Sequence, residues 1–461
     1  MDFLTADIRQ LYRKYLLASL GSALATSIYG FVDTIAVGQA VGPMGAAAIA
    51  VLNPFFSIMV FLAILCGIGG AVLMANAKGE GLEERGNAYF TAALVLVLGV
   101  IVVGWVVFFF FHEPVFRFFG ATDENMPYVL DYGKWLVWCF PGYILPIFLG
   151  AFLRNDGAPG LAMAAVVTGG LWNCFGDWYF CFPLDMGMAG AAIATVSGAS
   201  LQALIMATHF LRRGKCHLRL VWPQNILRDM RRIVTLGFGA GVLDLGNVFI
   251  AIIINNQILR YGSGDYLAVY GVVSTISLLF QALFAGAGQA SQPLISMNYG
   301  ARKLDRVQAV LRMGLATVGC MGVVFMLLGE LFPTQITRLF IAATPEVLAA
   351  APLAFRCYFI FFIFLGISVL ATYYLQSIMR ERAAMTVSVL RSLVLSITLL
   401  FVLPMFLGLP GVFLAMPLSE GIVAVIALIL VRRSMRAESH KAAAPAVAFF
   451  ALAHRGGVGV S

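Results

Sequence analysis

Long apolar segments that carry almost no charge dominate this sequence. We identify twelve of them, and each meets the length of about 20 apolar residues that a helix needs to cross a bilayer. They lie at roughly 16–39, 47–77, 88–111, 127–152, 160–181, 187–211, 233–260, 266–298, 308–332, 346–376, 383–404 and 411–431. Because the runs are continuous rather than alternating, they predict membrane-spanning helices and exclude an outer-membrane barrel. The expected fold class is an all-α polytopic membrane protein.

The composition excludes the main water-soluble classes. Only 11% of the 461 residues are charged and 61% are hydrophobic, whereas soluble domains are about 25% charged. The seven cysteines show no metal-ligand or redox spacing. No phosphate-binding loop or nucleophile motif occurs. We therefore expect no enzyme activity and no cofactor.

The basic residues predict the orientation of the chain. If the N-terminus is cytoplasmic, 25 of the 30 Lys and Arg fall at cytoplasmic ends or tails, as the positive-inside rule requires. The same rule explains the net charge of +8, so no nucleic-acid partner is expected. An even number of spans then places both termini in the cytoplasm.

An internal repeat divides the chain into two lobes. Several features coincide when the sequence is shifted by 221 residues, including Gly67 with Gly288, Gly79 with Gly300, Glu84-Arg85 with Asp305-Arg306 and Pro183 with Pro404. We predict an N-terminal lobe at 1–211, a cytoplasmic linker at 212–232, a C-terminal lobe at 233–434 and a disordered cytoplasmic tail at 435–461. Each lobe has six spans, so the repeat is parallel and leaves a cleft suited to alternating access.

Carboxylates inside the spans are the main functional candidates, because an acid there costs roughly 2.5–3.5 kcal/mol on insertion scales. Asp33 and Asp177 each follow the start of their span by 17 residues, which places both about 25 Å up. Asn173 lies one turn from Asp177, and Thr195 lies at a similar depth in the next span. This set of hard oxygen ligands could bind Na⁺ or hold a proton.

A second pair of acids, Asp244 and Glu420, lies near the predicted midplane of the C-terminal lobe. They could form a negative cleft wall that attracts organic cations, or could be satisfied structural residues. Aromatic and methionine side chains could add an adaptable apolar cavity, or could simply be packing residues. These candidates are Phe55, Met59, Phe280 and Phe284.

Three segments resemble the multidrug and toxic compound extrusion (MATE) family of bacterial transporters. They are SIYGFVDTIAVGQAVGPMGAAAIA, FLRNDGAPGLAMAAVVTGGLWNCFGDWYF and MGMAGAAIATVSG. The resemblance covers residues 10 to 434. It implies twelve spans in two lobes, and export of drugs or metabolites driven by Na⁺ or H⁺. The family's first-lobe cation site would correspond to Asp33, Asn173, Asp177 and Thr195.

The resulting hypothesis is an antiporter in a bacterial cytoplasmic membrane that exports small organic, cationic compounds in exchange for Na⁺ or H⁺. We expect a monomer whose partner is the lipid bilayer. One alternative is a lipid-linked saccharide flippase of the related fold, for which inward-facing residues such as Arg391 or Arg356 would be needed. A membrane scaffold or receptor is a further alternative.

Overall fold

A computed structural model describes the backbone of residues 3–212, 214–341 and 344–455, without the side chains of 43, 46, 136–139, 243–245, 248 and 439–455. These residues form helices and no strands. The helices of the first half are α1 (Ile8–Ala40), α2 (Pro43–Gly79), α3 (Glu83–Phe118), α4 (Met126–Asn155), α5 (Pro159–Cys181), α6 (Gly187–Ala207) and the short η1 (Thr208–Leu211). Those of the second half are α7 (Ile226–Tyr261), α8 (Gly264–Gly300), α9 (Leu304–Leu331), α10 (Pro333–Phe340), α11 (Pro345–Phe359), α12 (Phe361–Ser377), α13 (Glu381–Val389), η2 (Leu390–Val394), α14 (Leu395–Leu407) and α15 (Leu409–Arg455).

Twelve crossings follow from these helices. In the described part of the chain, nine helical stretches are long and apolar enough to span a membrane, and the bent α4 is a tenth. Three of the nine stretches are composite, because α6 continues into η1, α11 into α12, and α13 through η2 into α14. Helices α5 and α7 complete the twelve; at 23 and 36 residues and 1.5 Å per residue, both cover the hydrocarbon core.

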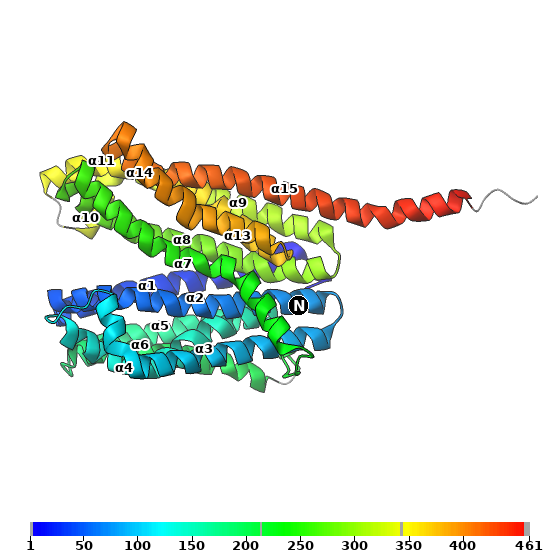
Figure 1. Cartoon of the computed structure of the whole chain (residues 1–461), viewed down its shortest axis with the longest axis horizontal. Coiled ribbons are helices and arrows are strands. Elements are labelled where there is room, and N and C mark those ends of the chain that lie inside the picture. The colour runs from blue at the N-terminus through cyan, green and yellow to red at the C-terminus, as the bar shows by residue number, and fades with distance from the viewer. Residues whose placement is uncertain (1–2, 213, 342–343, 456–461) are drawn as a thin grey trace, which may run out of the picture.

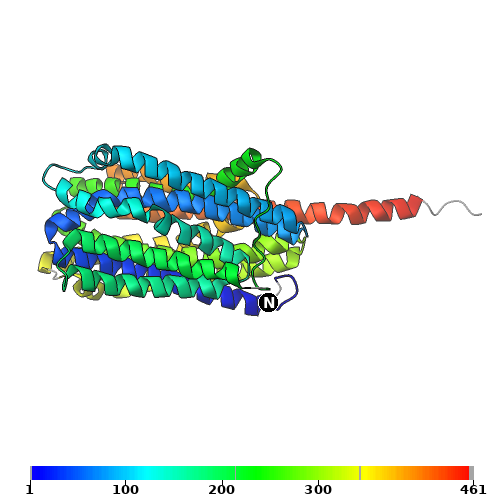
Figure 2. The same ribbon diagram turned by 90° about the horizontal axis from the view of Figure 1, so that it is seen from below.

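The helices form two lobes that lie side by side (Figures 1 and 2). Helices α1–α6 make the first lobe and α7–α15 the second, which confirms the predicted fold class. Several helices extend beyond the apolar segments that predicted them, and α7 is an example. Helix α7 begins at Ile226 rather than 233, because the Asn225 side chain accepts a hydrogen bond from the Arg228 N–H and caps the helix.

Glycines allow the lobes to meet at backbone distance. A Cβ atom on Gly69 would lie 2.2 Å from the Ile233 carbonyl oxygen, and one on Gly237 would lie 2.0 Å from the Leu65 carbonyl oxygen. Helices α2 and α7 therefore cross where neither has a side chain. Small residues commonly serve this purpose between membrane helices.

Polar contacts join the lobes near one end of the bundle, which we call the basic end because it carries Lys78, Arg302, Lys303 and Arg380. Asn76 Nδ2 donates to the Ser377 carbonyl at 3.0 Å. The amides of Asn155 and Gln292 exchange two hydrogen bonds at 3.1 and 3.2 Å. Arg85 pairs with the buried Asp229 at 2.7 Å. These contacts hold the two lobes together at the basic end.

Asp156 attaches the segment between the lobes to the first lobe. Its carboxylate lies 2.8 Å from His209 Nε2 and 3.4 Å from Lys78 Nζ, and it accepts from the His217 N–H at 2.9 Å. Burial would raise the pKa of Asp156, but the hydrogen bond with His209, the charge of Lys78 and the His217 N–H hold that pKa below its ordinary value of 3.8. Asp156 is therefore an ionised anchor.

The C-terminal tail corrects one prediction. The sequence predicts disorder from residue 435, yet α15 continues as one helix to Arg455 (Figure 1). The segment is rich in alanine, the residue with the highest helix propensity, and the prediction of disorder did not take this propensity into account. Glu438 also pairs with Arg380 at 3.0 Å. Residues 456–461 lie outside the described chain.

Candidate cation site and apolar cavity

Close packing of α5 on α6 creates the setting of the first-lobe site. A Cβ on Gly198 would lie 2.8 Å from the Gly169 carbonyl oxygen, and one on Gly176 would lie 2.9 Å from the Ala194 Cβ. On the other side of α5, a Cβ on Gly170 would lie 2.7 Å from the Tyr29 ring of α1. The small residues thus bring α1, α5 and α6 into contact at one level.

The four predicted first-lobe residues meet there. Thr195 Oγ1 donates to Asp33 Oδ1 at 3.3 Å, and Asn173 Nδ2 donates to Thr195 Oγ1 at 3.4 Å. The carboxyl groups of Asp33 and Asp177 lie within hydrogen-bonding reach of each other. Asp177 is fully buried and Asn173 is 4% exposed. Residues from three helices therefore form one cluster.

The cluster contains more acceptors than donors. Within the described part of the chain, neither Asp177 oxygen receives a hydrogen bond, and the Asn173 Oδ1 atom also has no donor. An ionised carboxylate only accepts hydrogen bonds, so Asp33 cannot satisfy Asp177 unless one of the two is protonated. A shared proton, or a cation bound by these oxygens, would supply the missing positive charge.

One member of the cluster was missed from the sequence. Tyr132 of α4 is almost fully buried, and its hydroxyl donates to Thr195 Oγ1 at 3.3 Å. Tyr132 lies near the start of α4, whereas Thr195 lies in α6, and no spacing rule connects them. A buried tyrosine hydroxyl needs a partner, but the sequence does not show which tyrosines are buried.

The structure describes the side-chain surroundings of one of the two predicted second-lobe acids, Glu420. Glu420 of α15 is buried, and Arg391 of η2 donates to it through Nε. Glu420 is therefore half of an ion pair rather than a bare negative wall. Asp244 lies on α7, but its side chain lies outside the described residues.

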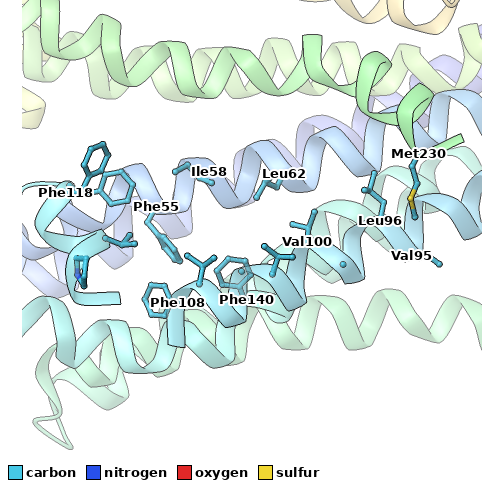
Figure 3. A pocket seen from close by; sticks show the side chains of 17 residues that line it. Phe55, Ile58, Leu62, Val95, Leu96, Val100, Phe108, Phe118, Phe140 and Met230 are labelled. Atoms are coloured by element: carbon cyan, nitrogen blue, oxygen red, sulfur yellow. The ribbon is translucent and has the colours of Figure 1, made fainter. Parts of the chain in front are cut away.

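A large cavity opens in the first lobe between α2, α3 and α4 (Figure 3). Its volume is about 900 Å³, and the seventeen residues that line it are all apolar. Phe55, Phe108 and Phe140 gather toward one end, and Met230 of α7 lies at the other. The structure thus places the predicted cavity residue Phe55 on a cavity wall. The described residues that line this cavity include no Lys or Arg, whereas a flippase would usually have a strongly cationic cavity.

The other three predicted cavity residues pack into the lobe cores. Met59 is fully buried in the first-lobe core. Phe280 stacks on Phe325 with the ring centroids 3.7 Å apart, and Phe284 packs against the same ring in the second-lobe core. Their packing is that of structural residues.

The MatE family model matches residues 18–179 and 245–402. The chain belongs to the MATE family. The first matched block contains Asp33, Asn173 and Asp177.

Relatives of this MATE protein are named as multidrug export proteins. The multidrug export protein MepA of Staphylococcus saprophyticus is 24% identical over 415 residues, which cover 89% of this chain and 90% of the relative. The MepA protein of Staphylococcus haemolyticus is 23% identical over 417 residues, with coverage of 89% and 90%.

Solved structures show the same fold. An outward-facing multidrug resistance MATE transporter superposes with a TM-score of 0.88 at 20% identity, covering 95% of this chain and 98% of that one. The Vibrio cholerae transporter VcmN gives 0.86 at 18% identity, with coverage of 93% and 97%. The chain is thus a membrane protein with the MATE efflux transporter fold.

Proposed function

We propose that this MATE protein is a secondary antiporter that exports lipophilic organic compounds, organic cations included, in exchange for Na⁺ or H⁺. The observation that carries the proposal is the buried Asp177 carboxylate, which receives no hydrogen bond and faces a second carboxylate, Asp33. A bare pair of this kind is costly inside a membrane. It therefore becomes stable when a proton or a cation neutralises it.

Neutralisation of the pair supplies the coupling. The ion-loaded pair is compatible with a dehydrated site, whereas the empty pair favours a conformation in which water reaches it. A ligand shifts a conformational equilibrium only by its differential affinity for the two states. Ion and substrate must therefore favour opposite states, so that binding of the ion promotes release of the substrate.

The first-lobe cavity supports the substrate class. A volume of about 900 Å³ lies within the usual range for drug-sized ligands, roughly 300–1,000 Å³. Its wall is apolar, and aromatic faces such as those of Phe55, Phe108 and Phe140 attract organic cations through their quadrupoles. Lipophilic cations would thus be accepted without a charged residue on the wall.

We place the protein in the bacterial cytoplasmic membrane as a monomer with both termini in the cytoplasm. The grouping of basic residues at one end supports this orientation. The interlobe contacts of Asn155 with Gln292 and of Asn76 with Ser377 close that same end. With the basic end in the cytoplasm, the conformation is closed to the inside, and alternating access requires these contacts to break.

The test uses purified protein in proteoliposomes loaded with ethidium. Na⁺ and pH gradients are imposed separately, and transport is followed by fluorescence. We expect one gradient to drive ethidium movement in the wild type and Asp177→Asn to abolish that drive. Ethidium binding in detergent should survive in the variant, without its dependence on Na⁺ or pH.

The matched control is Asp123→Asn, because Asp123 is exposed and pairs with the exposed Arg117. It should transport like the wild type. Full gradient-driven transport by Asp177→Asn would refute the assigned coupling site. If neither the Na⁺ gradient nor the pH gradient drives ethidium transport by the wild type, antiport itself is refuted.

A further inference from the structure

The second lobe contains a separate polar cavity. Its volume is about 180 Å³, and α7, α8, α11, α12, η2 and α15 enclose it. In contrast to the first-lobe cavity, its wall carries polar and charged groups. They are Asn247, Tyr270, Ser274, Ser277, Gln281, Tyr358, Arg391, Ser392 and Glu420.

A buried ion pair forms one wall of this second-lobe cavity. Arg391 is 8% exposed and Glu420 is 1% exposed, and the Arg391 Nε donates to Glu420 Oε1. Among the described residues, the Arg391 Nη1 atom has no acceptor, and Glu420 Oε2 receives no hydrogen bond of good geometry. The Ser368 hydroxyl lies near Glu420 but donates to the Phe364 carbonyl at 3.3 Å. The pair is neutral as a whole and leaves hydrogen-bonding capacity unused.

The local backbone is built to hold Arg391 in this place. Residues 390–394 form a π-helical turn, a rare feature that is frequent at functional sites. The Ser396 hydroxyl donates to the Arg391 carbonyl at 2.5 Å and contacts the Ser419 hydroxyl at 2.9 Å, beside Glu420. Gly246 of α7 lets Ser392 approach, since a Cβ there would lie 2.5 Å from the Ser392 Cβ.

The buried Arg391 donor without an acceptor indicates which kind of ligand would be stabilised next to it. A buried donor without an acceptor destabilises the fold, and a guanidinium presents its N–H groups in a planar fork that matches a carboxylate. Arg391 lines the cavity, so an oxyanion there would meet the guanidinium as its counter-charge. It would also lie near Glu420, so its own negative charge must be balanced.

We propose that this second-lobe cavity binds a small zwitterion, with its carboxylate on Arg391 and its ammonium group beside Glu420 and the Tyr270 and Tyr358 rings. Such a ligand places its dipole antiparallel to that of the ion pair. A simple cation would meet Arg391 as a like charge, and a simple anion would meet Glu420 as one. The rings of Tyr270 and Tyr358 lie 6.1 Å apart at 68° and offer π-faces to an ammonium group.

The cavity size restricts the ligand. A water molecule takes a share of about 30 Å³ in the liquid, so 180 Å³ corresponds to roughly six waters. Glycine betaine, a compact zwitterion with a quaternary ammonium group, suits this space, whereas drug-sized compounds do not. The site therefore goes beyond the exchange at Asp33 and Asp177 and recognises a different ligand class.

The experiment measures binding of radiolabelled glycine betaine to the purified protein in detergent. Choline lacks the carboxylate and butyrate lacks the ammonium group, so both serve as competitors. We expect each competitor to bind at least tenfold more weakly than glycine betaine. The absence of glycine betaine binding to the folded wild type, or equal competition by choline, would overturn the proposal.

Variants locate the binding. The double variant Arg391→Gln/Glu420→Gln removes both charges together and should weaken glycine betaine binding at least tenfold. Gln281→Leu leaves the pair intact and removes a polar wall group, so it carries the test if the double variant does not fold. Thr275→Val, on the same helix but outside the lining, should bind normally. Unchanged binding in a folded Arg391→Gln/Glu420→Gln or in Gln281→Leu would contradict the site.

This outcome is independent of the coupling test. Asp177→Asn should bind glycine betaine like the wild type, since Asp177 lies in the other lobe. In the wild type, glycine betaine binding without gradient-driven ethidium transport would refute the exchange proposal alone. Gradient-driven ethidium transport without glycine betaine binding would refute the second-lobe site alone.

Discussion

Gly79 of α2 and Gly300 of α8 face each other across the lobe boundary, and neither has room for a side chain. A Cβ on Gly79 would lie 2.2 Å from the Met297 carbonyl oxygen, and one on Gly300 would lie 2.2 Å from the Asn76 carbonyl oxygen. The two glycines coincide when the sequence is shifted by 221 residues. Equivalent positions of the two halves thus form the backbone contact at the basic end.

Gly300→Val should separate the lobes at this contact. The added side chain meets backbone, which cannot rotate away, and overpacking of this kind costs typically 1–3 kcal/mol. We expect a lower melting temperature in detergent and reduced ethidium export. Gly271→Val on the same helix is the control, because a Cβ there meets nothing within 4 Å. Equal behaviour of the two variants would show that the close contact is unimportant.

Thr195→Val should weaken ion coupling without abolishing it. The substitution removes the hydroxyl that donates to Asp33 at 3.3 Å and retains the shape of the side chain. The net contribution of one hydrogen bond is about 1 kcal/mol. Its loss corresponds to a roughly fivefold change in the half-saturating Na⁺ or H⁺ concentration. Thr195→Ser restores the hydroxyl and should behave like the wild type. Normal ion dependence of Thr195→Val would exclude the hydroxyl from the site.

Removing one charge of the Arg391–Glu420 pair should destabilise the protein more than removing both. Glu420→Gln leaves Arg391 buried without a counter-charge, and breaking a buried pair costs about 3–5 kcal/mol. Removing both charges in Arg391→Gln/Glu420→Gln should recover most of this loss. Melting temperatures of both variants in detergent provide the measurement. A double variant less stable than Glu420→Gln would argue against the pair as the origin of the loss.

Cysteine labelling in intact cells should verify the orientation. In a background without the native cysteines, single cysteines at positions 80, 225 and 440 should be protected from an impermeant reagent. Those at positions 122 and 263 should react. The prediction follows from the distribution of Lys and Arg. External labelling at position 225 would contradict the arrangement of two lobes joined in the cytoplasm.

The Asp156 anchor should make stability depend on acid pH. The folded-state pKa of Asp156 lies below 3.8, so its carboxylate stabilises the fold above pH 3.8, and this contribution is lost as the pH falls through the folded pKa. The difference in melting temperature between wild type and Asp156→Asn should therefore be constant near neutral pH and shrink below pH 3.8. A difference that persists unchanged at low pH would assign the effect to something other than the charge of Asp156.

The sequence alone determined the class of the protein and much of its first-lobe site. Apolar runs of membrane length and the scarcity of charge require spanning helices, because no other arrangement satisfies their backbone in lipid. The matching depths of Asp33 and Asp177, with Asn173 one turn away, follow from the constant rise of a helix. Intramembrane carboxylates stand out in any sequence because they are costly there.

The tertiary structure decided which side chains face each other. Composition shows that Phe55 and Phe280 are apolar, but only helix packing places the first on a cavity wall and the second in a stack with Phe325. The pairing of Arg391 with Glu420 depends on the π-helical turn and on the contact of Ser396 of α14 with Ser419 of α15. Helical periodicity gives the relative positions of residues within one helix. The rotation of each helix against its neighbours is set by side-chain packing, to which distant parts of the chain contribute.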